Sequence, residues 1–355
     1  MVEQKMRDYT YNQPETSPFY NNLISPLCDY IVDNYLPKWL TPNTISISGL
    51  LLATTSFLML NTIDTRREYY VLSSILWFLY GIFDNLDGKQ ARKLGVSSNS
   101  GEFLDHAVDS LVASMVGMSF QLMHNKFLKY DILVVLSYQV PFYFACWFHY
   151  SYGKLIIGNS IYNKPYFTVD ELNLFFIPLF ILFEYLFPGF WRYDIKLPHF
   201  NNLVIKNWGV LFNYCCFLYS ILNQIIYIVP SLYNSRVNSH YFLIPIAIHI
   251  FLKEYFSINI YFTTVPFSAL CITFIFLKIS KTISEKKNLS LFILISSSSI
   301  PIFLTKLLLV AFSSSLNYHL SGLFAIYIIQ FSIWAVIVYI YSSCLEKQVK
   351  NKKSK

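Results

Sequence analysis

Four aspartates and a histidine stand at short, regular spacings in one stretch of the chain. Asp84 and Asp87 are three residues apart, while Asp105 and Asp109 are four apart with His106 between them. On helices, each aspartate pair projects from a single face. Carboxylate oxygens suit Mg²⁺ or Mn²⁺, and four ionised aspartates balance two such ions. We therefore predict that all four aspartates bind metal, in a two-ion site that supports in-line displacement at phosphate.

Small and basic residues accompany the acids. Gly88 and Ala91 leave room for a nucleotide close to the backbone, and Arg92 can hold a phosphate through its planar guanidinium group. Gly101 would let two helices pack closely where the second one begins. Close helix packing by itself is an alternative explanation for both glycines.

His106 is the favoured general base. A neutral imidazole accepts a proton near neutral pH more readily than a carboxylate that already binds cations. Asp109 is the alternative base, and a purely structural histidine is a third possibility. Glu102 precedes His106 by four residues, so it either orients the imidazole or is a helix-start carboxylate favoured by the helix dipole.

The elements that position these residues are predicted to be membrane helices. The chain has 355 residues, of which 55% are hydrophobic and 13% are charged, whereas soluble domains are about 25% charged. With about 20 apolar residues needed to cross the hydrocarbon, we expect an all-α bundle of ten spans. They lie near residues 43–60, 69–91, 101–123, 131–151, 171–190, 207–229, 241–255, 257–280, 289–312 and 320–343.

An N-terminal interfacial helix is expected before the first span. Leu27, Tyr30, Ile31 and Tyr35 recur at helical spacing in this segment, although a loop packed on the bundle would explain it as well. We divide the chain into four parts: residues 1–42 with this helix, catalytic helices over 43–230, further spans over 231–345 and a basic tail over 346–355.

Most lysines and arginines fall on the side of the membrane that holds the N-terminus and the aspartates, if the spans alternate as predicted. Positive charge concentrates in cytoplasmic loops, so both termini and the active site are expected to face the cytoplasm. The net charge of +7 is then attraction to anionic lipid, and no nucleic-acid partner is expected. The six cysteines show no metal-ligand spacing and are interpreted as small core residues.

The full run D-x-x-D-G-x-x-A-R, eight residues, G-x-x-x-D-x-x-x-D is present from Asp84 to Asp109. It resembles the signature of the CDP-alcohol phosphotransferases. The segments TPNTISISGL, DGKQARK, GEFLDHAVDS and ACWFHYSYGKLIIG resemble the eukaryotic choline/ethanolamine phosphotransferase branch. Asn43 lies in the first of these segments and Trp147 in the last, and we count both as substrate-binding residues. The rings of Trp147 and His149, near the end of the fourth span, are suited to bind a choline ammonium by cation–π attraction. Anchoring at the membrane interface is an alternative explanation for both residues.

The resemblance implies an activity. Phosphocholine or phosphoethanolamine would pass from its CDP-alcohol to 1,2-diacylglycerol, giving phosphatidylcholine or phosphatidylethanolamine and CMP. It also implies a homodimer in an endoplasmic reticulum or Golgi membrane. The alternatives are a relative that joins CDP-diacylglycerol to a polyol, and a cation-coupled transporter that uses the same acids.

Overall fold

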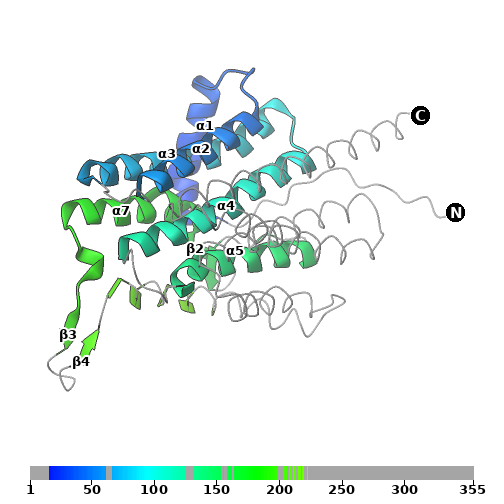
Figure 1. Cartoon of the computed structure of the whole chain (residues 1–355). Helices are drawn as coiled ribbons and strands as arrows, with labels where there is room; N and C mark the ends of the chain where they lie inside the picture. Colours follow the sequence, from blue (N-terminus) through cyan, green and yellow to red (C-terminus); the bar gives the residue numbers. More distant parts are fainter. Residues whose placement is uncertain are drawn as a thin grey trace, which may run out of the picture.

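The computed structural model describes residues 16–60, 66–124, 132–152, 155, 158–161, 164–197, 203–205, 208–209, 211–212, 215–216, 218–219 and 222. This part of the chain is mostly helical, as expected, and its longer helices lie beside one another (Figure 1). The helical elements are η1 (Tyr20–Ile24), α1 (Ser25–Asn34), α2 (Pro42–Leu60), α3 (Arg67–Leu94), α4 (Asn99–His124), α5 (Ile132–Tyr152), α6 (Val169–Glu171), η2 (Leu172–Phe176), α7 (Ile177–Leu186) and η3 (Phe190–Arg192).

Two short antiparallel hairpins were not predicted. β1 (Gly158–Ile161) pairs with β2 (Lys164–Thr168), and β3 (Ile195–Leu197) pairs with β4 (Leu203–Ile205). Each sheet has two strands, too few to form a hydrophobic core by itself. The helices therefore position the candidate site, and the hairpins join or extend them.

The segments of the first four predicted spans are helical, as the helices α2, α3, α4 and α5, with ends that agree within three residues. The fifth predicted span corresponds to α6, η2 and α7. The sixth is described only at scattered positions, and the remaining four lie outside the described residues. Within the described part of the chain, α2 alone is both long and apolar enough to cross a membrane by length and composition. The number of spans and their orientation therefore stay predictions.

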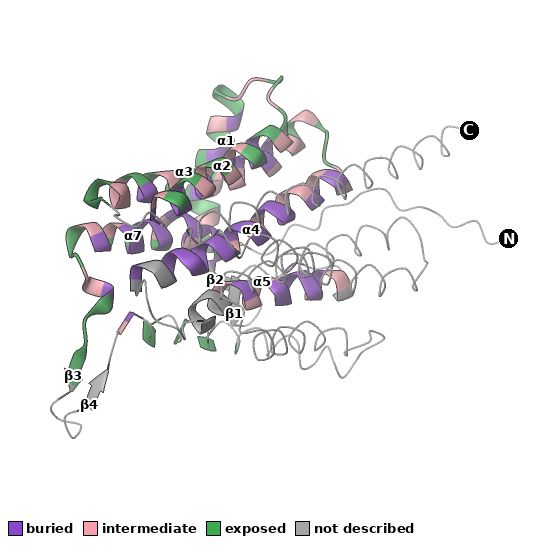
Figure 2. Cartoon of the chain, viewed as in Figure 1, coloured by how far each residue is buried: buried purple, intermediate pink, exposed green. Residues whose placement is uncertain are grey.

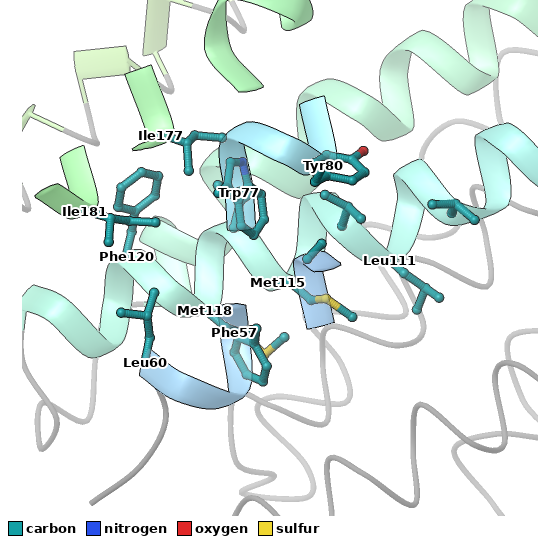
Figure 3. Packing of buried hydrophobic residues seen from close by; sticks show 14 of the residues in the cluster. Phe57, Leu60, Trp77, Tyr80, Leu111, Met115, Met118, Phe120, Ile177 and Ile181 are labelled. Carbon is teal, nitrogen blue, oxygen red and sulfur yellow. The ribbon is translucent and has the colours of Figure 1, made fainter. Parts of the chain in front are cut away.

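The main core lies between α2, α3, α4, α5 and α7, and Figure 3 shows part of it. Phe57 of α2, Trp77 of α3, Met115 of α4 and Ile181 of α7 are fully buried in it. Burial of each such side chain contributes about 1.5–3 kcal/mol. α4 is buried over most of its described surface, whereas the outer faces of α2 and α3 are exposed (Figure 2). The core thereby fixes α3 and α4, which carry the aspartates.

The N-terminal segment forms the predicted helix with two contrasting faces. Cys28 and Val32 of α1 are buried in a second cluster with Leu86 of α3, while Leu27 and Tyr30 are exposed on the opposite side. An exposed apolar face is what an interfacial helix requires. Its position in a membrane interface stays a prediction.

Two π-helical turns adjust the backbone where proline follows. η1 ends two residues before Pro26, and η2 ends two residues before Pro178. Proline has no N–H to donate, and its ring collides with the carbonyl group four residues earlier. A wider turn relieves that collision. The two segments meet where the Phe19 and Phe175 rings pack edge to face at 5.3 Å.

Candidate active site

A short, capped link, residues 95–98, joins α3 to α4. Gly95 ends α3 in the left-handed conformation (φ 65°), which glycine adopts without strain. The Val96 N–H then donates to the Ala91 carbonyl oxygen at 3.0 Å. Ser98 begins α4, because its Oγ accepts a hydrogen bond from the Gly101 N–H at 3.1 Å. The two aspartate pairs thus lie on either side of one tight turn.

Three of the four predicted metal ligands come together. Carboxylate oxygens of Asp84, Asp105 and Asp109 lie within 4.8 Å of one another. The Tyr80 hydroxyl, one turn before Asp84, donates to Asp109 at 3.2 Å and to Asp84 at 3.5 Å. We call these three aspartates the carboxylate cluster. The hydrogen bond from Tyr80 to Asp109 links α3 to α4 at this cluster, and α2 packs closely against both helices.

Asp87 lies outside the carboxylate cluster and has partners of its own. Its Oδ2 accepts a hydrogen bond from Ser46 of α2 at 2.5 Å, and its Oδ1 accepts one from the Gly88 N–H at 2.5 Å. The side chain is buried. These bonds orient a fourth carboxylate one helical turn from Asp84.

The carboxylate cluster fits a divalent cation. Its ligand atoms are hard oxygens from two different helices. They lie close enough together, within 4.8 Å, to bind the same ion. Three negative charges at this separation repel one another strongly. A bound Mg²⁺ or Mn²⁺ would remove that repulsion, so the donor set agrees with the metals predicted from the sequence.

The residues predicted to contact substrate lie around the end of α3. Arg92 is exposed, and its guanidinium nitrogen would be 3.4 Å from a Cβ placed on Gly88. Ala91 is half-buried beside it. A Cβ on Gly101 would approach Ser98 Oγ at 3.3 Å and Asn43 Oδ1 at 3.9 Å. Gly101 therefore provides space beside the polar start of α2.

Two residues of the same signature hold the N-terminal segment in place. The Lys89 ammonium group donates to Asp29 at 2.7 Å and to Ser25 at 2.7 Å, both on α1. The Gln90 side-chain amide donates to the backbone carbonyl oxygens of Pro37 and Leu40. These contacts attach α1 and the following loop to the C-terminal end of α3.

His106 lies on the side of α4 that faces α5. Its ring packs edge to face against His149 of α5, with ring centroids 5.7 Å apart. Glu102 lies beside the two histidines, and its Oε1 is 3.7 Å from His149 Nε2. All three side chains are buried. Trp147 is also buried, within the main core, and its role in substrate binding stays a prediction.

A buried polar group supports the site from the α6 side. Burial raises the pKa of Asp170 to about 6 from its ordinary 3.8, although hydrogen bonds from Asn85 and Thr168 partly offset the rise. Asn85 directly follows Asp84 on α3, and its amide also donates to the Gly81 carbonyl oxygen at 2.9 Å. Asp170 lies 86 positions after Asp84 in the sequence, so no local spacing relates it to the aspartates of α3.

Sequence reasoning also missed Tyr80 and Ser46. Tyr80 precedes Asp84 by four residues, so helical spacing alone was a usable signal. Ser46 lies in the TPNTISISGL run, but nothing in that run indicates that it would meet Asp87 of another helix.

A protein-family model described as CDP-alcohol phosphatidyltransferase matches residues 39–187. This range begins before α2 and ends after α7, so it contains both groups of acidic residues and the histidines. This segment, which makes up less than half of the chain, is therefore similar to a family of transferases.

Several proteins are similar to about half of the chain. A Dictyostelium discoideum protein named uncharacterized CDP-alcohol phosphatidyltransferase class-I family protein 2 is 31% identical over 196 residues, which cover 53% of this chain and 46% of that protein. Choline/ethanolaminephosphotransferase 1 of Arabidopsis thaliana is 31% identical over 179 residues, 48% of this chain and 44% of the relative. Cholinephosphotransferase 1 of Mus musculus is 28% identical over 185 residues, 50% and 45% of the two chains. The chain thus spans about half the length of the relatives it matches.

Proposed function

We propose that this protein transfers phosphocholine or phosphoethanolamine from the CDP-alcohol to the free hydroxyl of 1,2-diacylglycerol. The products are phosphatidylcholine or phosphatidylethanolamine and CMP. The observation that carries this proposal is the approach of Asp84, Asp105 and Asp109 to within 4.8 Å of one another, inside the segment that matches the transferase family.

The four signature aspartates are proposed to hold two Mg²⁺ or Mn²⁺ ions. Asp84, Asp105 and Asp109 contribute the carboxylate cluster, and Asp87 is oriented beside it by Ser46. Divalent ions bound there would supply positive charge that offsets the charge of a diphosphate. Arg92 is proposed to bind a phosphate oxygen of the nucleotide, which its exposed position permits.

His106 is proposed as the general base. Asp109 shares the carboxylate cluster and accepts a hydrogen bond from Tyr80, so its oxygens are better suited to bind metal than to take up a proton. His106 follows Asp105 directly in α4. Its imidazole lies with Glu102 and His149, not in the carboxylate cluster. It would take the proton from the glycerol hydroxyl, whose oxygen then attacks the β-phosphorus as CMP leaves.

The remaining assignments follow from this function. We propose that the catalytic helices extend over residues 43–230, with further membrane helices over 231–345. Two relatives are named as choline- or ethanolaminephosphotransferases, which supports a role for this protein in phospholipid biosynthesis at a membrane. Diacylglycerol would enter the site from the lipid. An endoplasmic reticulum or Golgi membrane and a homodimer are proposed on the family resemblance alone.

The test supplies the purified full-length protein with labelled CDP-choline, CDP-ethanolamine and CDP-diacylglycerol in turn. We expect labelled phospholipid and CMP from at least one of the first two, only when diacylglycerol and Mg²⁺ or Mn²⁺ are both present. Turnover of CDP-diacylglycerol with a polyol alone would show a different transferase. Cation flux in vesicles without release of CMP would show a transporter.

A matched pair of variants links the activity to the site. Asp105→Asn should lower turnover at least about 100-fold, since it removes charge that a phosphoryl-transfer site uses in the transition state. Asp33→Asn is the control, because Asp33 is an exposed aspartate that pairs with Lys93 at 3.5 Å. Equal activity of the two variants would contradict the assignment.

A further inference from the structure

Glu102, His106 and His149 form a second group of metal-ligating atoms, separate from the carboxylate cluster. One ligand atom from each residue lies within 4.8 Å of the other two. Glu102 and His106 are four residues apart on α4, so both project from the same helical face. His149 meets them from α5, which packs along α4.

All three side chains are buried. Their relative exposures are 7% for Glu102, 4% for His106 and 4% for His149. A carboxylate at such depth requires a nearby positive charge or strong hydrogen bonds. Glu102 Oε1 lies 3.7 Å from His149 Nε2, close enough for both atoms to bind one metal ion.

The two groups differ in ligand chemistry. Asp84, Asp105 and Asp109 offer oxygen atoms only, which suit hard ions such as Mg²⁺. Glu102, His106 and His149 offer two imidazole nitrogens and one carboxylate oxygen, a set that suits Zn²⁺ and related transition ions. One protein therefore presents a hard site and a softer site on adjacent faces of α4.

We propose that Glu102, His106 and His149 bind one Zn²⁺ ion, with a fourth position left for solvent. Zinc bonds of about 2.0–2.1 Å in a tetrahedron place neighbouring ligand atoms about 3.3 Å apart. The observed 3.7 Å between Glu102 and His149 is already close to this value. The widest separation, up to 4.8 Å, closes with side-chain movements of about 1 Å.

Zinc at this site inhibits the transferase, a consequence that rests on the proposed function. A metal ion bound to an imidazole nitrogen occupies the lone pair that would accept a proton. His106 then no longer acts as the base, even while Mg²⁺ or Mn²⁺ fills the carboxylate cluster. Mg²⁺ does not compete effectively, because nitrogen ligands favour the softer ion.

The binding test uses equilibrium dialysis of the purified full-length protein against Zn²⁺ in saturating Mg²⁺, with bound zinc measured by mass spectrometry. We expect His149→Gln to bind one equivalent less than the parent, with affinity at this site at least about 100-fold lower. This follows because the loss of even an outer-shell partner lowers metal affinity about 10–100-fold. The variant should still bind Mn²⁺, which shows that it is folded.

Asp109→Asn is the matched control, because it changes the carboxylate cluster and leaves the three zinc ligands in place. It should keep the zinc equivalent and lose Mn²⁺ affinity. Zinc binding that is equal in the parent and His149→Gln, or lost equally in His149→Gln and Asp109→Asn, would overturn the proposal.

An activity measurement separates the zinc site from the proposed function. Zinc at a concentration that inhibits the parent should leave the activity of His149→Gln unaffected. If no CDP-alcohol is turned over at all, the proposed function fails, but the dialysis result still decides the zinc site. Inhibition of both proteins at the same Zn²⁺ concentration would refute the inhibitory role.

Discussion

Lys89 attaches α1 to the end of α3 that carries the site, and loss of its partner should destabilise the protein more than loss of Lys89 itself. Its ammonium nitrogen lies 2.7 Å from an Asp29 oxygen and 2.7 Å from Ser25 Oγ. The lysine side chain is 7% exposed, whereas that of Asp29 is 57% exposed. The cation is therefore buried, and the anion is mostly in solvent.

This asymmetry sets the expected magnitudes. Asp29→Ala leaves a buried ammonium with the Ser25 hydroxyl, and a hydrogen bond to a charged group is worth about 1.5–3 kcal/mol. Solvent around the exposed carboxylate favours the lower end, about 1.5 kcal/mol. Lys89→Met removes the charge and keeps an unbranched apolar stem, so it should change stability by less than about 1 kcal/mol.

The assay is thermal unfolding in detergent, combined with transferase kinetics. Asp29→Ala should lower the Tm by about 3–6 °C, taking about 2–4 °C per kcal/mol. Lys89→Met should keep both its Tm and its KM for the CDP-alcohol. Lys93→Met serves as the control, because Lys93 also reaches α1 but is 27% exposed. A Lys89→Met protein with unchanged Tm and a KM raised more than tenfold would refute the reasoning and assign Lys89 to substrate binding.

Three further predictions concern the site and its surroundings. Ser46→Ala should raise the Mn²⁺ concentration needed for half-maximal activity about 10–100-fold, because Ser46 orients Asp87; Ser48→Ala, whose hydroxyl donates to a backbone carbonyl of its own helix, should have no such effect. The pKa of Asp170 is raised in the folded protein, so its contribution to stability is full below about pH 4 and is lost as the pH rises through about 6, by up to about 3 kcal/mol. Between pH 4.5 and pH 7 in saturating Mg²⁺, the Tm of Asp170→Asn should therefore fall by less than the Tm of the parent. An equal fall in Tm for the two proteins would contradict this. Removal of divalent ions by a chelator should abolish turnover, and added Mg²⁺ or Mn²⁺ should restore it, whereas full activity in the chelator would exclude the metal site.

The sequence by itself determined the helices around the site. Apolar runs bounded by charged and turn-forming residues predicted α2, α3, α4 and α5 to within three residues at each end. Helical periodicity also placed Asp84 with Asp87, and Asp105 with Asp109, on shared faces. These features are local, since they depend on neighbours within one or two helical turns.

The sequence also determined the signature that relates the chain to its family, because fixed residue types at fixed spacings are read directly from the chain. The spacing of the signature did not reveal that Lys89 and Gln90 attach α1 and the next loop to α3. Nor did it show the hairpins, whose strands of three to five residues are too short for a periodic pattern.

Only the tertiary structure decided how the site is divided. It joined Tyr80 to Asp109 and Ser46 to Asp87, pairs that are 29 and 41 positions apart. It also placed His106 against His149 of α5, in a group of ligand atoms distinct from the carboxylate cluster. Such contacts depend on how each helix is rotated and which neighbour it packs against. Side-chain packing across several helices sets both, and the period of a single helix does not.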